Sequence, residues 1–145
     1  MRRSLLALAL LAAVALTAAS ILPPEPDDEE HAVRAAIEFY FQGHATGDGT
    51  HFEQVFHPES ELMWMRDGAF NQRTSADYIG GARGVPADDE ADRARRITDI
   101  DITGDAAVVR LELDYPGALI TDYMSMLKVD GRWQIVNKIF HVEPK

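Results

Sequence analysis

The sequence predicts an α+β fold in which helices pack on one face of a bent antiparallel sheet. Three observations predict it. Apolar residues recur with a helical period over residues 33–44, the pattern becomes extended after Pro58, and turn signals recur from Ile97 onward. A chain of 145 residues is most simply a single domain with one hydrophobic core.

The first twenty residues have the pattern of a secretory signal peptide. Arg2 and Arg3 form a positively charged start, residues 5–16 are apolar, and residues 17–20 are small. We expect cleavage after Ser20 and export to a periplasm or the extracellular medium, with an uncleaved anchor or twin-arginine export as alternatives. Residues 21–27 would then form a polar spacer, and residues 28–145 the domain.

The composition excludes several classes of site. The chain has 14 Lys and Arg, 24 Asp and Glu, a formal net charge of −10 and no cysteine. Disulfides, cysteine nucleophiles and iron–sulfur clusters are therefore excluded. The acidic balance argues against nucleic acid as a partner and, after signal cleavage, against an anionic membrane. We expect no cofactor and no metal, because the acidic residues 88–92 lack the glycine and spacing of an EF-hand loop.

Two helices are expected at the start of the domain. Asp27 or Asp28 would cap the first helix, and Gly47 would end it. A second, short helix would run from Asp48 to Pro58. One side of the first helix carries Val33, Ala36, Ile37, Tyr40, Phe41 and His44. This stripe is expected to face the sheet.

After Pro58 a hairpin, a helix and a loop are expected. Strands over residues 62–65 and 70–73 would be joined by a turn at residues 67–68, and Ser75 would cap a short helix. Residues 85–96 carry two charge clusters and almost no large apolar group, which indicates a solvated loop.

A four-strand meander is predicted from Ile97 to the end, with turns at residues 103–105, 116–117 and 130–131. In the last strand, strict alternation places Asn137 and His141 on the inner face with Trp133. We expect Asp122 to face outward, because Lys128 lies on the same face of its strand.

Several short motifs together resemble one known family. They are Phe39 to Asp48 (FYFQGHATGD), Phe56-His57-Pro58, Asp114 to Gly117 (DYPG), Thr121 to Ser125 (TDYMS) and Leu127 to Lys138 (LKVDGRWQIVNK). Their order and spacing resemble the lumazine-binding family of the nuclear-transport-factor-2-like (NTF2-like) superfamily, over about residues 30 to 143. The resemblance implies a cone-shaped curved sheet around the first helix, a pocket at one end, and frequent dimerisation through the sheet.

The candidate pocket residues are those expected to face the inside of the cone. Tyr40 and His44 lie one helical turn apart, so both aim at the sheet together, and an imidazole with a phenol can move a proton or orient a carbonyl. Each residue also has a plainer interpretation as core or surface. The predicted pocket comprises Tyr40, His44, Met63, Met65, Tyr115, Tyr123 and Asn137.

Three functions are consistent with this sequence. The expected one is an exported domain that binds a small apolar or aromatic molecule, with no assigned reaction. The first alternative is an acid–base enzyme of the dehydratase, isomerase or cyclase type, with Tyr40, His44 and Asn137 handling protons and substrate. A buried carboxylate within hydrogen-bond reach of Tyr40 or His44 would favour it. The second is a homodimer or interaction module that uses the outer sheet face at Val136, Phe140 and Val142.

Overall fold

The computed structural model describes residues 26–145, which fold as helices packed against one six-stranded sheet. The helices are α1 (Pro26–Thr46), α2 (Gly49–Val55), α3 (Ser75–Gly80) and the 3-10 turn η1 (Glu90–Asp92). The strands are β1 (Phe56–Arg66), β2 (Ala69–Thr74), β3 (Ala94–Thr103), β4 (Ala106–Tyr115), β5 (Ala118–Val129) and β6 (Arg132–Pro144). The predicted signal peptide and nearly all of the spacer lie outside the described residues.

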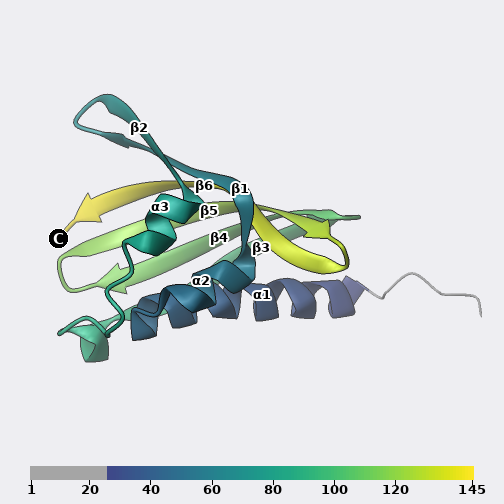
Figure 1. Ribbon diagram of the computed structural model, residues 1–145, viewed down its shortest axis with the longest axis horizontal. Helices are drawn as coiled ribbons and strands as arrows, with labels where there is room; N and C mark the ends of the chain where they lie inside the picture. The colour runs from purple at the N-terminus through teal and green to yellow at the C-terminus, as the bar shows by residue number, and fades with distance from the viewer. Residues whose placement is uncertain (1–25) are drawn as a thin grey trace, which may run out of the picture.

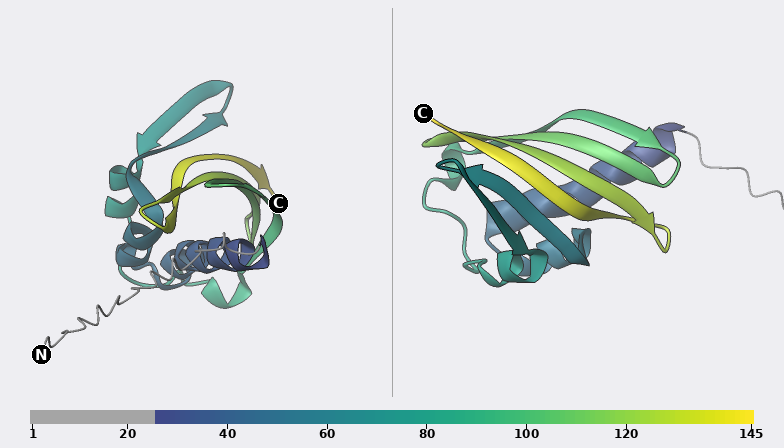
Figure 2. Two further views of the ribbon diagram at one scale, coloured as in Figure 1. Left: turned by 90° about the vertical axis from the view of Figure 1, so that its right-hand side faces the viewer. Right: turned by 90° about the horizontal axis from the view of Figure 1, so that it is seen from above.

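The sheet has the order β2-β1-β6-β5-β4-β3 and curves around α1 (Figure 1). All neighbouring strands are antiparallel except β1 and β6, which are parallel. Seen along the helix, the sheet forms an arch over α1, while the β1–β2 hairpin bends away from the rest (Figure 2). The predicted α+β fold with a curved sheet is confirmed.

Local sequence signals set most of the element boundaries. Gly47 ends α1 with a positive φ of 70°, and the Asp48 side chain caps α2 by accepting a hydrogen bond from the Thr50 backbone at 2.9 Å. Asp67 and Asp130, each followed by glycine, adopt positive φ at the two hairpin turns where the sequence predicts them. The turns at residues 104–105 and 116–117 are also confirmed.

Several boundaries differ from the expectation. The first helix already begins at Pro26, so Asp27 and Asp28 lie in its first turn and do not cap it. The second helix ends at Val55, and Phe56 begins β1 by pairing with Ile135 of β6, so tertiary pairing overrides the helical pattern before Pro58. Thr74 caps α3 instead of Ser75, whose buried hydroxyl donates to the backbone of β1. The expected loop at 85–96 contains η1, and β3 already starts at Ala94 because its residues pair with β4.

A β-bulge in β6 reverses the expected face of its second half. Met126 of β5 lies opposite Ile135, but the preceding Ser125 lies opposite Asn137, so Val136 is an extra residue in β6. After the bulge the alternation is inverted: Lys138 is buried and Asn137 faces outward. The expected inner placement of Asn137 and His141 was therefore wrong.

Asp122 is also on the opposite side of the sheet from the one expected. Its side chain is fully buried under α1. Lys128 does share its face, but the Lys128 amine reaches Glu29 of α1 at 2.5 Å, inside the arch. A lysine at the end of a strand can turn inward when a helical carboxylate lies opposite, so its presence did not mark the outer face.

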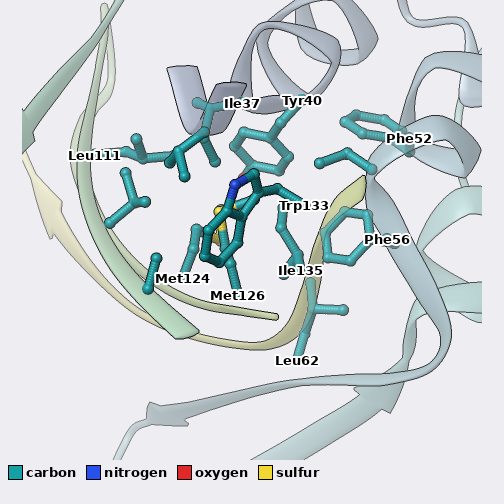
Figure 3. Close-up of a cluster of buried hydrophobic side chains, with 14 of the residues drawn as sticks. Ile37, Tyr40, Phe52, Phe56, Leu62, Leu111, Met124, Met126, Trp133 and Ile135 are labelled. Atoms are coloured by element: carbon teal, nitrogen blue, oxygen red, sulfur yellow. The ribbon is translucent and has the colours of Figure 1, made fainter. Parts of the chain in front are cut away.

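The core fills the space between α1 and the inner face of the sheet (Figure 3). Its largest fully buried apolar side chains are Tyr40, Ile37, Leu62, Leu111, Leu113, Met124, Met126 and Ile135. α2 closes one end of this core with Phe52, whose ring lies beside that of Tyr40. Within residues 26–145, no helix is both long and apolar enough to cross a membrane.

The contact of α1 with α2 depends on a glycine. A Cβ atom at Gly43 would lie 2.5 Å from the Phe52 ring, whereas a Cβ at Gly80 would have no neighbour within 4 Å. We expect Gly43→Ala to lower the free energy of unfolding by about 1–3 kcal/mol, because the core cannot take an extra methyl group there. The control, Gly80→Ala, is expected to be neutral or slightly stabilising. Urea unfolding measures both; equal stability of the two variants would contradict the prediction.

Candidate functional site

A lysine, an aspartate and a tyrosine lie together inside the arch. Tyr40 projects from α1, Asp122 from β5 and Lys138 from β6, and all three are buried. The Tyr40 hydroxyl donates to Oδ2 of Asp122 at 2.6 Å, and Nζ of Lys138 donates to the Tyr40 oxygen at 2.5 Å. Lys138 and Asp122 also form an ion pair at 3.0 Å. We call these three residues the buried triad.

Burial sets the proton affinities in the buried triad. It raises the pKa of Tyr40 well above its ordinary value, and the negative charge of Asp122 adds to this shift. Burial lowers the pKa of Lys138, while the Asp122 carboxylate opposes that change. Oδ1 of Asp122 is buried and has no hydrogen-bond partner among the described residues. The buried triad can therefore hold a proton away from water and still has an open acceptor.

A second polar pair lies beside the buried triad. The Tyr78 hydroxyl of α3 lies 2.9 Å from Nε2 of His44, and the His44 ring packs edge-on against Tyr40 with centroids 4.7 Å apart. Burial and then the positive charge of Lys138 hold the pKa of His44 well below its ordinary value. Burial raises the pKa of Tyr78. At neutral pH His44 is thus uncharged and Tyr78 is a protonated phenol, and the two side chains share one hydrogen bond.

The pair forms part of the wall of a cavity of about 360 Å³. The cavity lies at the carboxyl end of α1, against Phe52 of α2 and the small residues of the segment 81–87. Three arginines complete the lining, namely Arg73, Arg83 and Arg93. The buried triad lies behind the aromatic wall, with Nζ of Lys138 5.6 Å from the centroid of the Tyr78 ring. A ligand in this cavity would meet His44 and Tyr78 directly.

Tyr115 lies at the same end of the fold. Its ring centroid is 6.4 Å from that of His44, and its hydroxyl accepts a hydrogen bond from Nε of Arg95 at 3.0 Å. Arg95 in turn makes two bonds to Glu90, at 2.6 and 2.8 Å. This pairing lowers the pKa of Glu90 and fixes η1 against β3. Of the predicted pocket residues, the structure brings together Tyr40, His44 and Tyr115.

The other four predicted pocket residues lie elsewhere. Met63 of β1, Ile139 of β6 and Tyr123 of β5 are register partners on the outer face of the sheet. Asn137 donates to the backbone oxygen of Glu61, and Met65 is exposed on the bent hairpin. Of the residues proposed for an outer contact, Val142 is exposed, but Phe140 stacks on Trp64 and lies under Lys138.

Sequence reasoning missed Lys138, Asp122 and Tyr78 as site residues. Asp122 was expected on the outer face, and strict alternation in the last strand also places Lys138 there, opposite Asn137. Tyr78 follows Ser75 in the predicted short helix, for which no functional role was expected. The available signal was chemical, because a carboxylate at Asp122 would be a natural general base if its side chain faced inward. The bulge at Val136, which brings Lys138 to it, leaves no mark in the periodicity.

Comparisons with known proteins agree on the fold. The family model "Putative lumazine-binding" matches residues 28–141. Aldolase FrzH from Cladobotryum sp is 30% identical over 120 residues, which cover 81% of this chain and 94% of that protein. An NTF2-like protein of unknown function from Shewanella baltica OS155 is 25% identical with a TM-score of 0.77, covering 85% of this chain and 100% of its own. Another, from Methylobacillus flagellatus KT, is 27% identical with a TM-score of 0.69, covering 83% and 95%.

Removing one charge of the buried triad should lower the free energy of unfolding more than removing both charges. We expect Lys138→Met to lower the free energy of unfolding by about 3–5 kcal/mol at neutral pH, because the Asp122 carboxylate stays buried without its cation. The double variant Lys138→Met with Asp122→Asn should recover part of that loss. As a matched control, Lys128→Met breaks an ion pair nearer the surface and should cost less. Urea unfolding tests this order, and a double variant less stable than Lys138→Met would contradict it.

His44 should make stability fall in mild acid. Its folded pKa lies well below the unfolded value of about 6.5, so only the unfolded chain takes up a proton as the pH drops below that value. The stability of the native protein should therefore decrease from pH 6.5 to 5 by up to about 1.4 kcal/mol per pH unit relative to His44→Gln. Above pH 7 the histidine makes no such difference. Urea unfolding at each pH gives the free energy of unfolding of both proteins. If this free energy depends on pH equally in both proteins, the prediction is contradicted. As a control, His31→Gln changes an exposed histidine and should show the same pH dependence as the native protein.

Proposed function

This chain belongs to the lumazine-binding family of NTF2-like proteins, and from that premise we propose that it is an acid–base enzyme that acts on a small carbonyl compound. The observation that carries the proposal is the His44–Tyr78 pair on the cavity wall, backed by the buried triad. Family membership supports a domain that binds a small molecule. The carboxylate of Asp122 within hydrogen-bond reach of Tyr40 favours an enzyme over a purely binding domain.

The relative from Cladobotryum sp bears the name of an aldolase, which supports carbonyl chemistry for this cavity. An aldol reaction begins when a base removes a proton from the carbon next to a carbonyl group. The negative charge then moves to the carbonyl oxygen, where a hydrogen-bond donor stabilises it. The cavity wall offers one base and one donor side by side, in His44 and Tyr78.

In the proposed mechanism, the substrate carbonyl oxygen displaces His44 as the acceptor of the Tyr78 hydroxyl. The freed Nε2 of His44 takes the α-proton, and the C–H electron pair forms the enolate. The enolate carbon attacks a second carbonyl, whose oxygen takes the proton back from the imidazolium. The buried triad acts as a positioning group, because Tyr40 packs against the His44 ring and is itself held by Asp122 and Lys138.

This function predicts exchange of α-protons with solvent. The protein in D₂O should replace the α-protons of small ketones by deuterium. NMR follows this as loss of signal across a panel that includes the neutral phenylacetone and the anionic levulinate. His44→Gln should slow the exchange by about 100-fold or more, because general base catalysis contributes that much. Tyr78→Phe should slow it as well, since it removes the donor to the enolate oxygen.

The matched control is His31→Gln, which changes an exposed histidine of α1 outside the cavity lining. It should exchange at the native rate. Failure of the native protein to exchange any ketone of the panel, or an unchanged rate in His44→Gln, would rule out this function.

A further inference from the structure

The cavity beside His44 has a charge opposite to that of the whole protein. The chain carries a formal net charge of −10. Yet the side chains that line the cavity include Arg73, Arg83 and Arg93 and, within the part of the chain that the structure describes, no aspartate or glutamate. The three arginines come from β2, from the segment after α3 and from the segment before β3. Separate elements thus bring positive charge to one place.

Two of these guanidinium groups are not committed to a protein carboxylate. Arg73 lies over the ring of Tyr78, 4.7 Å from its centroid, and neither Arg73 nor Arg83 forms an ion pair among residues 26–145. Arg93 uses Nε for Asp89, at 2.7 Å, and lies 4.2 Å from the centroid of the Tyr115 ring. Its remaining nitrogens stay available. Each arginine can therefore donate to an incoming ligand.

The rest of the lining indicates the shape of the ligand. Phe52, Val85 and Ala87 give an apolar wall, while His44 and Tyr78 supply the polar pair. A volume of about 360 Å³ is within the range of small-molecule sites. The forked guanidinium donors of arginine fit the oxygens of a carboxylate or a phosphate. A neutral ligand would leave these donors unpaired.

We propose that this cavity selects ligands that carry an oxyanion group, a carboxylate or a phosphate, on a small apolar body. Arg73 and Arg83 bind the oxyanion, and Arg93 adds positive charge to the same lining. The apolar wall holds the body of the ligand so that its other end meets His44 and Tyr78. This inference rests on the cavity used in the proposed function and adds the charge of the substrate to it.

Three small probes of similar shape test the proposal by NMR titration of the purified protein. Phenylacetate and phenyl phosphate carry the two oxyanions, and phenylacetamide is the neutral analogue. At least one anion should bind at least about tenfold more tightly than phenylacetamide, which is the magnitude of a lost charged hydrogen bond. The anion that binds better identifies the group that the arginines prefer.

The variants assign that preference to the cavity. Arg83→Gln changes an exposed side chain and should fold normally, while Arg73→Gln is a second, independent probe. The double variant should lose the preference for the anion. Arg132→Gln, at the start of β6 and outside the cavity lining, should keep it. Equal binding of phenylacetamide, no binding of either anion, or a preference that survives in the double variant would overturn the proposal.

Failure of the oxyanion site and failure of the acid–base function give different results in these experiments. Arginine-dependent binding of an anion without exchange of α-protons would leave the oxyanion site standing and remove the acid–base function. Exchange of α-protons in neutral ketones with no preference for anions would do the reverse.

Discussion

The ion pair between Lys138 and Asp122, closed by the Tyr40 hydroxyl, is the interaction on which the rest of the site depends. Moving two charges out of water costs several kcal/mol each, and their attraction repays this only with good geometry. Apolar residues of the same size would fill this space at less cost. A pair buried in this way is therefore no sign of added stability. With one carboxylate oxygen unpartnered among the described residues, it fits the acid–base function proposed above.

The same interaction determines where α1 lies on the sheet. Tyr40 joins α1 to Asp122 on β5 and to Lys138 on β6. At the other end of α1, Glu29 accepts hydrogen bonds from Lys128 of β5 and from Trp133 of β6, and these bonds lower its pKa. The two helical positions are 40 − 29 = 11 residues apart, about three turns, so both face the sheet. Two polar attachments to the same pair of strands thus fix the helix and, with it, His44 one turn beyond Tyr40.

The architecture could be predicted from the sequence, but half of the site could not. The helical stripe that ends at His44 and the aspartate–glycine turns are local signals, and the structure has them where they were expected. Side chains along a strand alternate between the two faces of the sheet. One extra residue therefore moves every later side chain to the face opposite the one expected. Val136 is such a residue, and no nearby glycine or proline indicates it. The face of Asp122 was inferred from Lys128, whose partner Glu29 is 99 residues away in the sequence.

The bulge therefore decides the chemistry of the interior as well as the geometry of β6. With strict alternation, Asn137 would point inward and Lys138 would lie on the outer face. Asp122 would then be buried without a cation, a state that costs several kcal/mol. Because Val136 shifts the register by one residue, Lys138 lies on the inner face instead, where its ammonium group reaches the Asp122 carboxylate. Asn137 then binds the backbone of β1 on the outer face. The register of the last strand and the charge pair beneath α1 thus depend on each other: the bulge makes the buried carboxylate tolerable, and the ion pair accounts for keeping an irregular strand.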